Sequence, residues 1–132
     1  MKNWEINSPA DAAELNKYLA AHDGKIDGDL IVWEKASLTA DALTSVGGYL
    51  IVRYNASLPA LTSVGGDLIV RYNASLPALT SVGGYLSVRY NASLTADALT
   101  SVGGYLIVRE KASLTADALT SVGGKPYQKG GK

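Results

Sequence analysis

The amino-acid sequence predicts a mainly β protein: a right-handed β-solenoid of five 18- or 20-residue coils with one parallel sheet and an N-terminal α-helical cap. Three observations lead to this fold class. Residues 28–123 consist of five near-identical units. Each unit contains a short segment in which inward and outward side chains alternate, as in a β-strand. Residues 1–27 instead contain apolar residues at helical spacing. Units of this length that follow one another without spacers are typical of solenoids, in which each repeat packs only on its neighbours.

The N-terminal segment, residues 1–27, is expected to cover the first coil. Ser8 is a favourable N-cap residue, and Pro9 suits the first position of a helix that should continue to about His22. Apolar residues recur along it at helical spacing, at Ala12, Leu15, Tyr18 and Leu19. We therefore expect this apolar stripe to lie over Leu30 and Val32 of the first coil.

Five repeat units follow, and their boundaries divide the chain into a cap, a solenoid and a tail. The units are residues 28–47, 48–65, 66–83, 84–103 and 104–123. The second reads GYLIVRYNASLPALTSVG and the fifth GYLIVREKASLTADALTSVG, so comparing LPAL with LTADAL places the two extra residues of the longer units on the arc after the strand. Residues 124–132 form a polar tail that is too short to be a second cap, so the far end is expected to be less protected.

Each unit begins with Leu-x-Val, which has the period of a β-strand with Leu and Val facing inward. Asn55, Asn73 and Asn91 come three residues after the Val and indicate a bend at which the chain leaves the sheet. Further apolar residues in each unit are expected to point back into the core, as Leu58, Leu61 and Val64 do in the second unit. The Gly-Gly pairs between units predict tight corners with positive φ.

The strand, Asn and Leu arrangement in SVGGYLIVRYNASLPALTSVGG resembles that of leucine-rich-repeat solenoids, and is most similar to the receptor L domain-like short-coil variant. The resemblance covers residues 28–123. It implies a ligand-binding or structural scaffold without enzymatic residues. Units this similar indicate either recent amplification of one unit or a consensus design.

Composition excludes several function classes. Twelve Lys and Arg balance twelve Asp and Glu, so no net field attracts nucleic acid or an anionic membrane. The chain has no Cys and a single His22, which leaves no disulfide, no thiol nucleophile and no multi-His metal site. We therefore expect no enzyme activity, no catalytic residue, no cofactor and no metal. Without a signal-peptide pattern or an apolar run of about 18 residues, a cytoplasmic protein that does not enter the membrane is expected.

The outward side of the strands is the candidate binding face. Because the units stack in register, each position forms a column of side chains about 4.8 Å apart. The middle column combines Ile31, Ile51, Ile69 and Ile107 with Ser87, and on either side run two further columns, Asp29, Tyr49, Asp67, Tyr85, Tyr105 and Trp33, Arg53, Arg71, Arg89, Arg109. Tyr, Ile and Arg are typical of protein interfaces. The expected partner is another protein or a second copy of this chain, with a dimer as the expected oligomer.

Other interpretations remain open at this point. The Arg column with Tyr54, Tyr72 and Tyr90 beside it is an alternative site for an anionic ligand or nucleic acid, and the columns of Thr44, Thr62, Thr80, Thr100 and Thr120 with the following Ser are an alternative ice-binding surface. Asn55, Asn73 and Asn91 are expected to form a structural amide ladder. Association through the edge strand at residues 105–108, flanked by Glu110 and Lys111, competes with association through the outward strand face.

Overall fold

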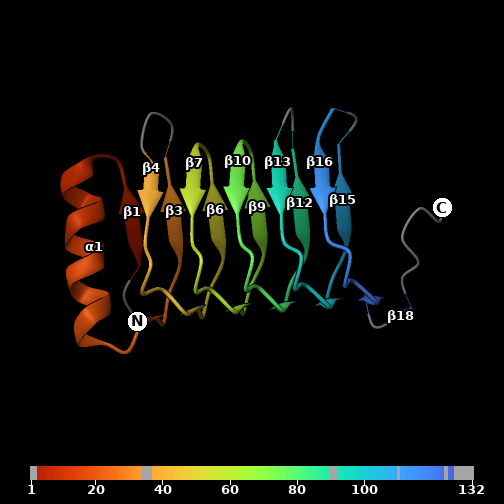
Figure 1. Ribbon diagram of the computed structural model, residues 1–132, viewed down its shortest axis with the longest axis horizontal. Coiled ribbons are helices and arrows are strands. Elements are labelled where there is room, and N and C mark those ends of the chain that lie inside the picture. Colours follow the sequence, from red (N-terminus) through yellow and green to blue (C-terminus); the bar gives the residue numbers. More distant parts are fainter. Residues whose placement is uncertain (1–2, 34–36, 90–91, 110, 124, 127–132) are drawn as a thin grey trace.

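The computed structural model describes residues 3–33, 37–89, 92–109, 111–123 and 125–126. The protein is a straight rod of stacked coils with a helix at its N-terminal end (Figure 1). Strands of successive coils pair in parallel along the rod. The predicted fold class, a mainly β solenoid of about five turns with an N-terminal helix, is confirmed.

Three sheets run along the rod, which we call the front, back and side sheets. The front sheet contains β1 (Trp4–Ile6), β3 (Leu30–Val32), β6 (Leu50–Val52), β9 (Leu68–Val70), β12 (Leu86–Val88) and β15 (Leu106–Val108). The back sheet contains β4 (Ser37–Thr39), β7 (Asn55–Ser57), β10 (Asn73–Ser75), β13 (Ser93–Thr95) and β16 (Ser113–Thr115). The side sheet contains β2 (Lys25–Ile26), β5 (Ser45–Val46), β8 (Ser63–Val64), β11 (Ser81–Val82), β14 (Ser101–Val102), β17 (Ser121–Val122) and β18 (Lys125–Pro126).

The prediction of a single sheet was wrong, because the chain re-enters a sheet where a bend was expected. Asn55 and Asn73 begin the back strands β7 and β10. The back strands alternate outward, inward, outward, which is the opposite phase to the front strands, and Ala56 of β7 is buried between two outward polar residues. A strand of three residues is stable here because neighbouring coils pair with it on both sides, as β4 and β10 do with β7.

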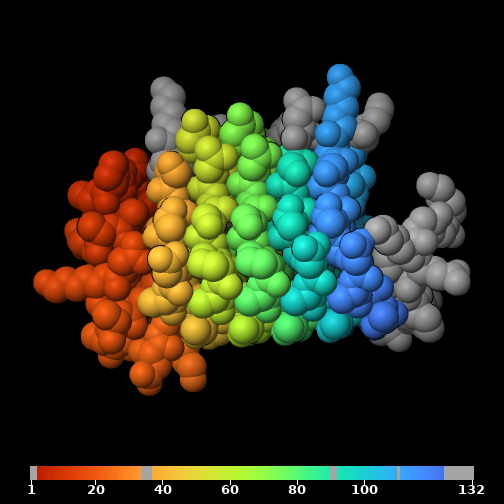
Figure 2. All heavy atoms as spheres, in the orientation of Figure 1, coloured from red at the N-terminus to blue at the C-terminus, as the bar shows by residue number. Residues whose placement is uncertain are grey.

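The inward side of the front sheet matches the prediction. Leu68 and Val70 are fully buried, whereas Ile69 between them is only half-buried. Each strand is fixed by ladder hydrogen bonds, such as that from the Leu50 N–H to the Asp67 carbonyl oxygen at 2.9 Å. Figure 2 shows the coils as slabs packed against one another along the rod.

The two extra residues of the longer coils lie elsewhere than predicted. Strand pairing aligns Leu38 with Ala56 and Ala74 with Leu94, so SLTADAL and NASLPAL align without a gap. Four residues separate β3 from β4 and only two separate β6 from β7, which places the extra residues in the turn between front and back strands. The core keeps its volume because Leu-x-Ala in the longer coils becomes Ala-x-Leu in the shorter ones.

The N-terminal cap is an incomplete coil. β1 and β2 add one strand each to the front and side sheets, and α1 (Pro9–Ala21) lies where a back strand would be. The helix begins as predicted, with Ser8 Oγ accepting the Asp11 N–H at 3.3 Å. Leu15 and Leu19 are buried as expected, but α1 packs on β1 and β4 because the unpredicted strand β1 extends the front sheet beyond Leu30 and Val32.

Close stacking, and not positive φ, explains the glycine pairs. Among the described residues, the glycines with positive φ are Gly24 and Gly123. Gly123 belongs to the last expected corner, so the predicted conformation is confirmed there, but the glycine pairs between stacked coils do not adopt it. A Cβ on Gly65 would overlap the carbonyl oxygen of Gly47 in the preceding coil. The prediction was therefore wrong for the pairs between stacked coils, where glycine is needed because a larger residue would force adjacent coils apart.

The last coil is less covered than the others, as the short tail predicted. Val108 is 42% exposed, whereas Val88 at the same position of the preceding coil is fully buried. Beyond β17, the described residues are Gly123 and β18, and β18 pairs antiparallel with β17 in the side sheet.

Candidate functional site

The outward side of the front sheet, which we call the front face, places the predicted candidate residues in register. The middle column consists of Ile31, Ile51, Ile69, Ser87 and Ile107, with Glu5 of β1 paired to Ile31 at the N-terminal end. Ladder pairing fixes the side chains of this column at one strand spacing, about 4.8 Å. The predicted middle column is therefore present.

Two rims border the middle column, because residues two positions away along a strand share its face. We call them the acid-Tyr rim and the Arg rim. The acid-Tyr rim is Asp29, Tyr49, Asp67, Tyr85 and Tyr105, and the Arg rim is Trp33, Arg53, Arg71, Arg89 and Arg109. Exposure on the acid-Tyr rim is greatest at the last coil, where Tyr105 is 78% exposed, compared with 36% for Tyr49.

Hydrogen bonds to the backbone hold the two carboxylates of the acid-Tyr rim. Asp29 Oδ1 accepts the N–H of Tyr49 at 2.9 Å, and Asp67 Oδ1 accepts the N–H of Tyr85 at 3.0 Å. Each carboxylate thus bonds to the following coil. These bonds fix the negative charge on this rim and leave the second carboxylate oxygen available for a further donor.

The N-terminal end of the Arg rim is built by packing. The Arg53 guanidinium lies 5.0 Å from the centre of the Trp33 ring, in a cation–π arrangement. Trp33 Nε1 donates a hydrogen bond to Glu5 Oε1 at 2.8 Å. This chain of contacts links β1, β3 and β6 and orders the rim where it approaches the cap.

Ser87 lies below the surface of the front face. Its side chain is 4% exposed, while Ile107 beside it in the middle column is 39% exposed. A small side chain between two isoleucines leaves a depression in an otherwise continuous apolar ridge. The burial of Ser87 could not be predicted from the repeat pattern.

Tyr54 and Tyr72 stack on each other where the chain passes from the front to the back sheet. Their ring centres are 5.3 Å apart and the rings are inclined by 3°. Each ring therefore covers one face of the other, which leaves less ring surface for stacking of nucleic-acid bases. Tyr90 lies outside the described residues.

The expected ladder of three asparagines is not formed as predicted. Asn73 pairs with Ser93 in the next coil, because the longer turn shifts the alignment by two residues. Asn73 Oδ1 accepts the Ser93 N–H at 3.3 Å, so its amide does bond along the rod. Asn91 lies outside the described residues.

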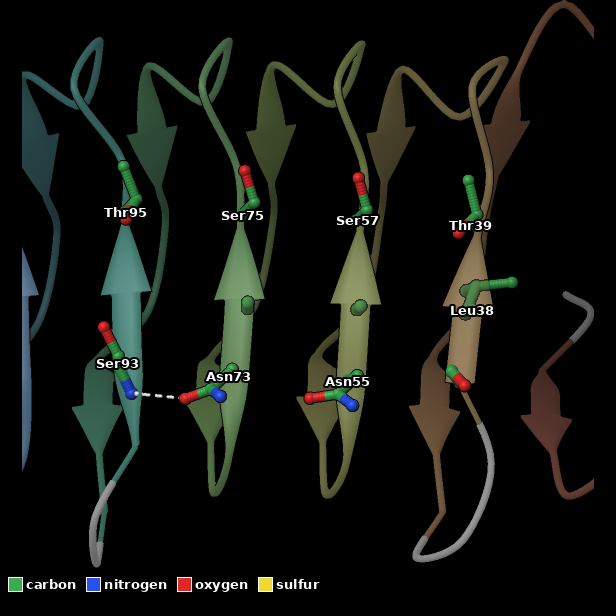
Figure 3. Close-up of a pocket in the computed structure, with 11 residues that line it drawn as sticks. Leu38, Thr39, Asn55, Ser57, Asn73, Ser75, Ser93 and Thr95 are labelled. Carbon is green, nitrogen blue, oxygen red and sulfur yellow. Dashed lines mark hydrogen bonds between the residues drawn. The ribbon is translucent and has the colours of Figure 1, made fainter.

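A shallow groove of about 360 Å³ on the back sheet was not predicted (Figure 3). Apart from Leu38, small or polar side chains line it, with Ala56 and Ala74 at its floor. Its two outer rows are Ser37, Asn55, Asn73, Ser93 and Thr39, Ser57, Ser75, Thr95. Aligning SLT with NAS without a gap would have revealed both rows in the sequence.

The Thr column lies on the surface of the rod, where its hydroxyl groups bond one coil to the next. Thr62 Oγ1 donates to the carbonyl oxygen of Thr44 in the preceding coil at 3.0 Å, and Thr80 bonds to Thr62 in the same way. The contact repeats at Thr100 and Thr120. These hydroxyl donors are used within the protein, which reduces what the column offers to ice.

Residues with catalytic or metal-binding chemistry are dispersed. In the described ranges, His, Asp and Glu side chains do not gather in groups of three or more that could hold a metal ion. His22 stacks on Tyr18 with ring centres 3.8 Å apart, and its Nδ1 lies 2.9 Å from the Tyr18 carbonyl oxygen. Its position is explained by packing at the end of α1.

Within the described residues, no helix has the length and apolar character needed to cross a membrane. No known protein family matches the chain, and comparison with curated proteins and with solved structures finds no match either. The fold and the front face therefore provide the arguments about function.

Proposed function

We propose that the chain is a leucine-rich-repeat-like, non-enzymatic scaffold that binds protein through its front face. The observation that carries the proposal is the registered face three residues wide, with an aliphatic middle column between an acid-Tyr rim and an Arg rim. Aromatic residues and Arg are the residues that contribute most to binding at protein interfaces. The rod beneath the face is held by ladder bonds, so binding requires little ordering of the backbone.

Protein binding is better supported than the alternatives. An anionic ligand or nucleic acid would use the Arg rim, but Arg53 already stacks on Trp33 and the chain has no net charge. Ice binding through the Thr column is less well supported, because the Thr hydroxyl groups already donate hydrogen bonds to carbonyl oxygens of the preceding coil. A cytoplasmic location remains part of the proposal and follows from sequence alone.

A displayed peptide library tests this proposal. Binders selected on the wild-type rod are expected to lose affinity for Ile51→Lys/Ile69→Lys, which places two cations in the middle of the front face. They should keep affinity for Ser57→Lys/Ser75→Lys, which makes the same charge change at exposed positions of the back sheet in the same coils. Melting curves check that both variants fold. Binders that respond only to the back-sheet variant, or to both equally, would contradict a front-face site.

A further inference from the structure

The two rims of the front face differ in charge, and this difference restricts how two such faces can meet. Asp29 and Asp67 lie on the acid-Tyr rim, and the four arginines of the chain lie on the opposite rim. Both rims run the length of the rod because strand pairing keeps the coils in register. The face is therefore polarised across its width.

Two symmetric face-to-face arrangements are available to identical rods. If the twofold axis runs along the strands, the rods are antiparallel and each rim faces its own copy, which sets arginines of one copy against arginines of the other. If the axis runs parallel to the rod, the rods point the same way and each acid-Tyr rim faces the Arg rim of the other copy. Facing like charges are costly and opposite charges are favourable, so only the second arrangement is complementary.

We propose that the front face binds a second copy of this chain in a parallel, coil-to-coil dimer, with both helical caps at the same end. This inference rests on the proposed function and names its partner. In this dimer Asp67 of each copy faces Arg71 of the other, and Ile69 meets Ile69 on the twofold axis. The tyrosines of the acid-Tyr rim then face arginines, which is a favourable cation–π pairing.

The rest of the rod leaves this surface accessible. α1 replaces a back strand and packs on β4, where Asn16 Nδ2 donates to the Thr39 carbonyl oxygen at 3.1 Å. The helix therefore caps the end of the rod without covering the front face. Asp67 is held on its rim by the Tyr85 N–H and keeps an oxygen for an incoming guanidinium.

The size of the face predicts a weak dimer. Five coils at about 4.8 Å give a length of roughly 24 Å, and the three outward residues of each strand span four residue steps, which gives a width of roughly 13 Å. A face of roughly 300 Å² per copy is well below the roughly 800 Å² per partner of a standard specific interface. Dimerisation is therefore expected to depend on concentration, and charge changes at the rims should shift it measurably.

Reversal of one charge pair tests the arrangement by analytical ultracentrifugation over a concentration series. Asp67→Arg alone and Arg71→Asp alone should each weaken dimerisation roughly tenfold or more, because a twofold dimer contains the pair twice. An equimolar mixture of the two variants should restore it. Asp41→Arg, the same change at an exposed site after the back strand β4, is the matched control and should have no effect. Single variants that dimerise like wild type would overturn the parallel arrangement.

Cross-linking tests the coil-to-coil register independently. The chain has no Cys, so Ile31→Cys and Ile107→Cys each introduce one thiol at opposite ends of the middle column. A bis-maleimide that spans about 10 Å, the separation of facing sheets, should link each variant to itself. Linkage only in a mixture of the two variants would show antiparallel rods and refute the proposal.

The two proposals fail in different ways. A wild-type rod that stays monomeric at the highest concentration, but whose selected peptides still require Ile51 and Ile69, overturns the second copy as partner and leaves protein binding supported. If the wild-type rod stays monomeric and the selected peptides do not require Ile51 and Ile69, both the dimer and the front-face binding site are overturned. Dimerisation that is restored by the charge-swap mixture supports both.

Discussion

Exchange of one large and one small core residue tests how the two coil lengths share one core. Coil four carries Leu94 and Ala96, both fully buried, whereas the preceding coil carries Ala74 and Leu76 at the aligned positions. We consider Leu94→Ala, Ala96→Leu and the double variant, which would give coil four the core pattern of coil three.

The expected magnitudes follow from packing. Leu94→Ala leaves a cavity beside Ala74, which cannot fill it, and should lower the free energy of unfolding by about 2–5 kcal/mol. Ala96→Leu crowds a closed layer beside Leu76 and should cost about 1–3 kcal/mol. The double variant conserves the volume and should cost less than about 1.5 kcal/mol, so the two changes couple favourably by about 1.5 kcal/mol or more.

Urea denaturation followed by circular dichroism measures the cycle, and equal slopes for all four proteins are required because a solenoid can lose coils separately. The volume argument would be refuted by additive losses. In that case the long turn, and not the layer of side chains, would decide which of the two positions holds Leu.

Four further outcomes are expected. Leu68→Ala should cost about 2–5 kcal/mol in urea denaturation and Ile69→Ala far less, and comparable losses would contradict the assigned strand faces. Ser8→Ala should cost about 1 kcal/mol by removing the N-cap of α1, and an unchanged stability would show that the cap bond contributes nothing. Gly65→Ala should cost about 1–3 kcal/mol because its Cβ meets the preceding coil, and a neutral result would mean that the corner yields. Deletion of residues 1–22 should cause aggregation, detected by light scattering, and a monomeric, equally stable product would refute the cap.

The front sheet could be predicted because two independent patterns agree there. Alternation in Leu-x-Val identifies the inward side chains, and repetition of the unit fixes which residues pair. Leu50, Leu68 and Leu86 are accordingly stacked and buried. The same two patterns located the middle column of the candidate face, since outward positions follow once inward ones are known.

The back and side sheets could not be predicted, for reasons of length and alignment. Ser45-Val46 is too short for a period to be detected, and it is a strand only because neighbouring coils pair with it. The back strands were not recognised because the extra residues were placed wrongly. LTADAL and LPAL begin and end with the same residues, so a sequence alignment puts a gap between them, and this gap removes the match between SLT and NAS. Strand pairing of Leu38 with Ala56 resolves the position, since a layer tolerates the exchange of a large and a small residue.

The candidate face depends on details that a repeat pattern does not contain. The exposure of Ser87 depends on the isoleucines beside it in the middle column, and these leave it only 4% exposed. The anchoring of Asp67 depends on the N–H of Tyr85 in the next coil. Positions that stack inside the rod must keep the total volume of each layer, because each layer packs on the next, so only compensated exchanges such as Leu38 for Ala56 are accommodated. The rims are free of this constraint, and Asp and Tyr on one rim against Trp33 and four Arg on the other are the residues through which we propose that a partner is recognised.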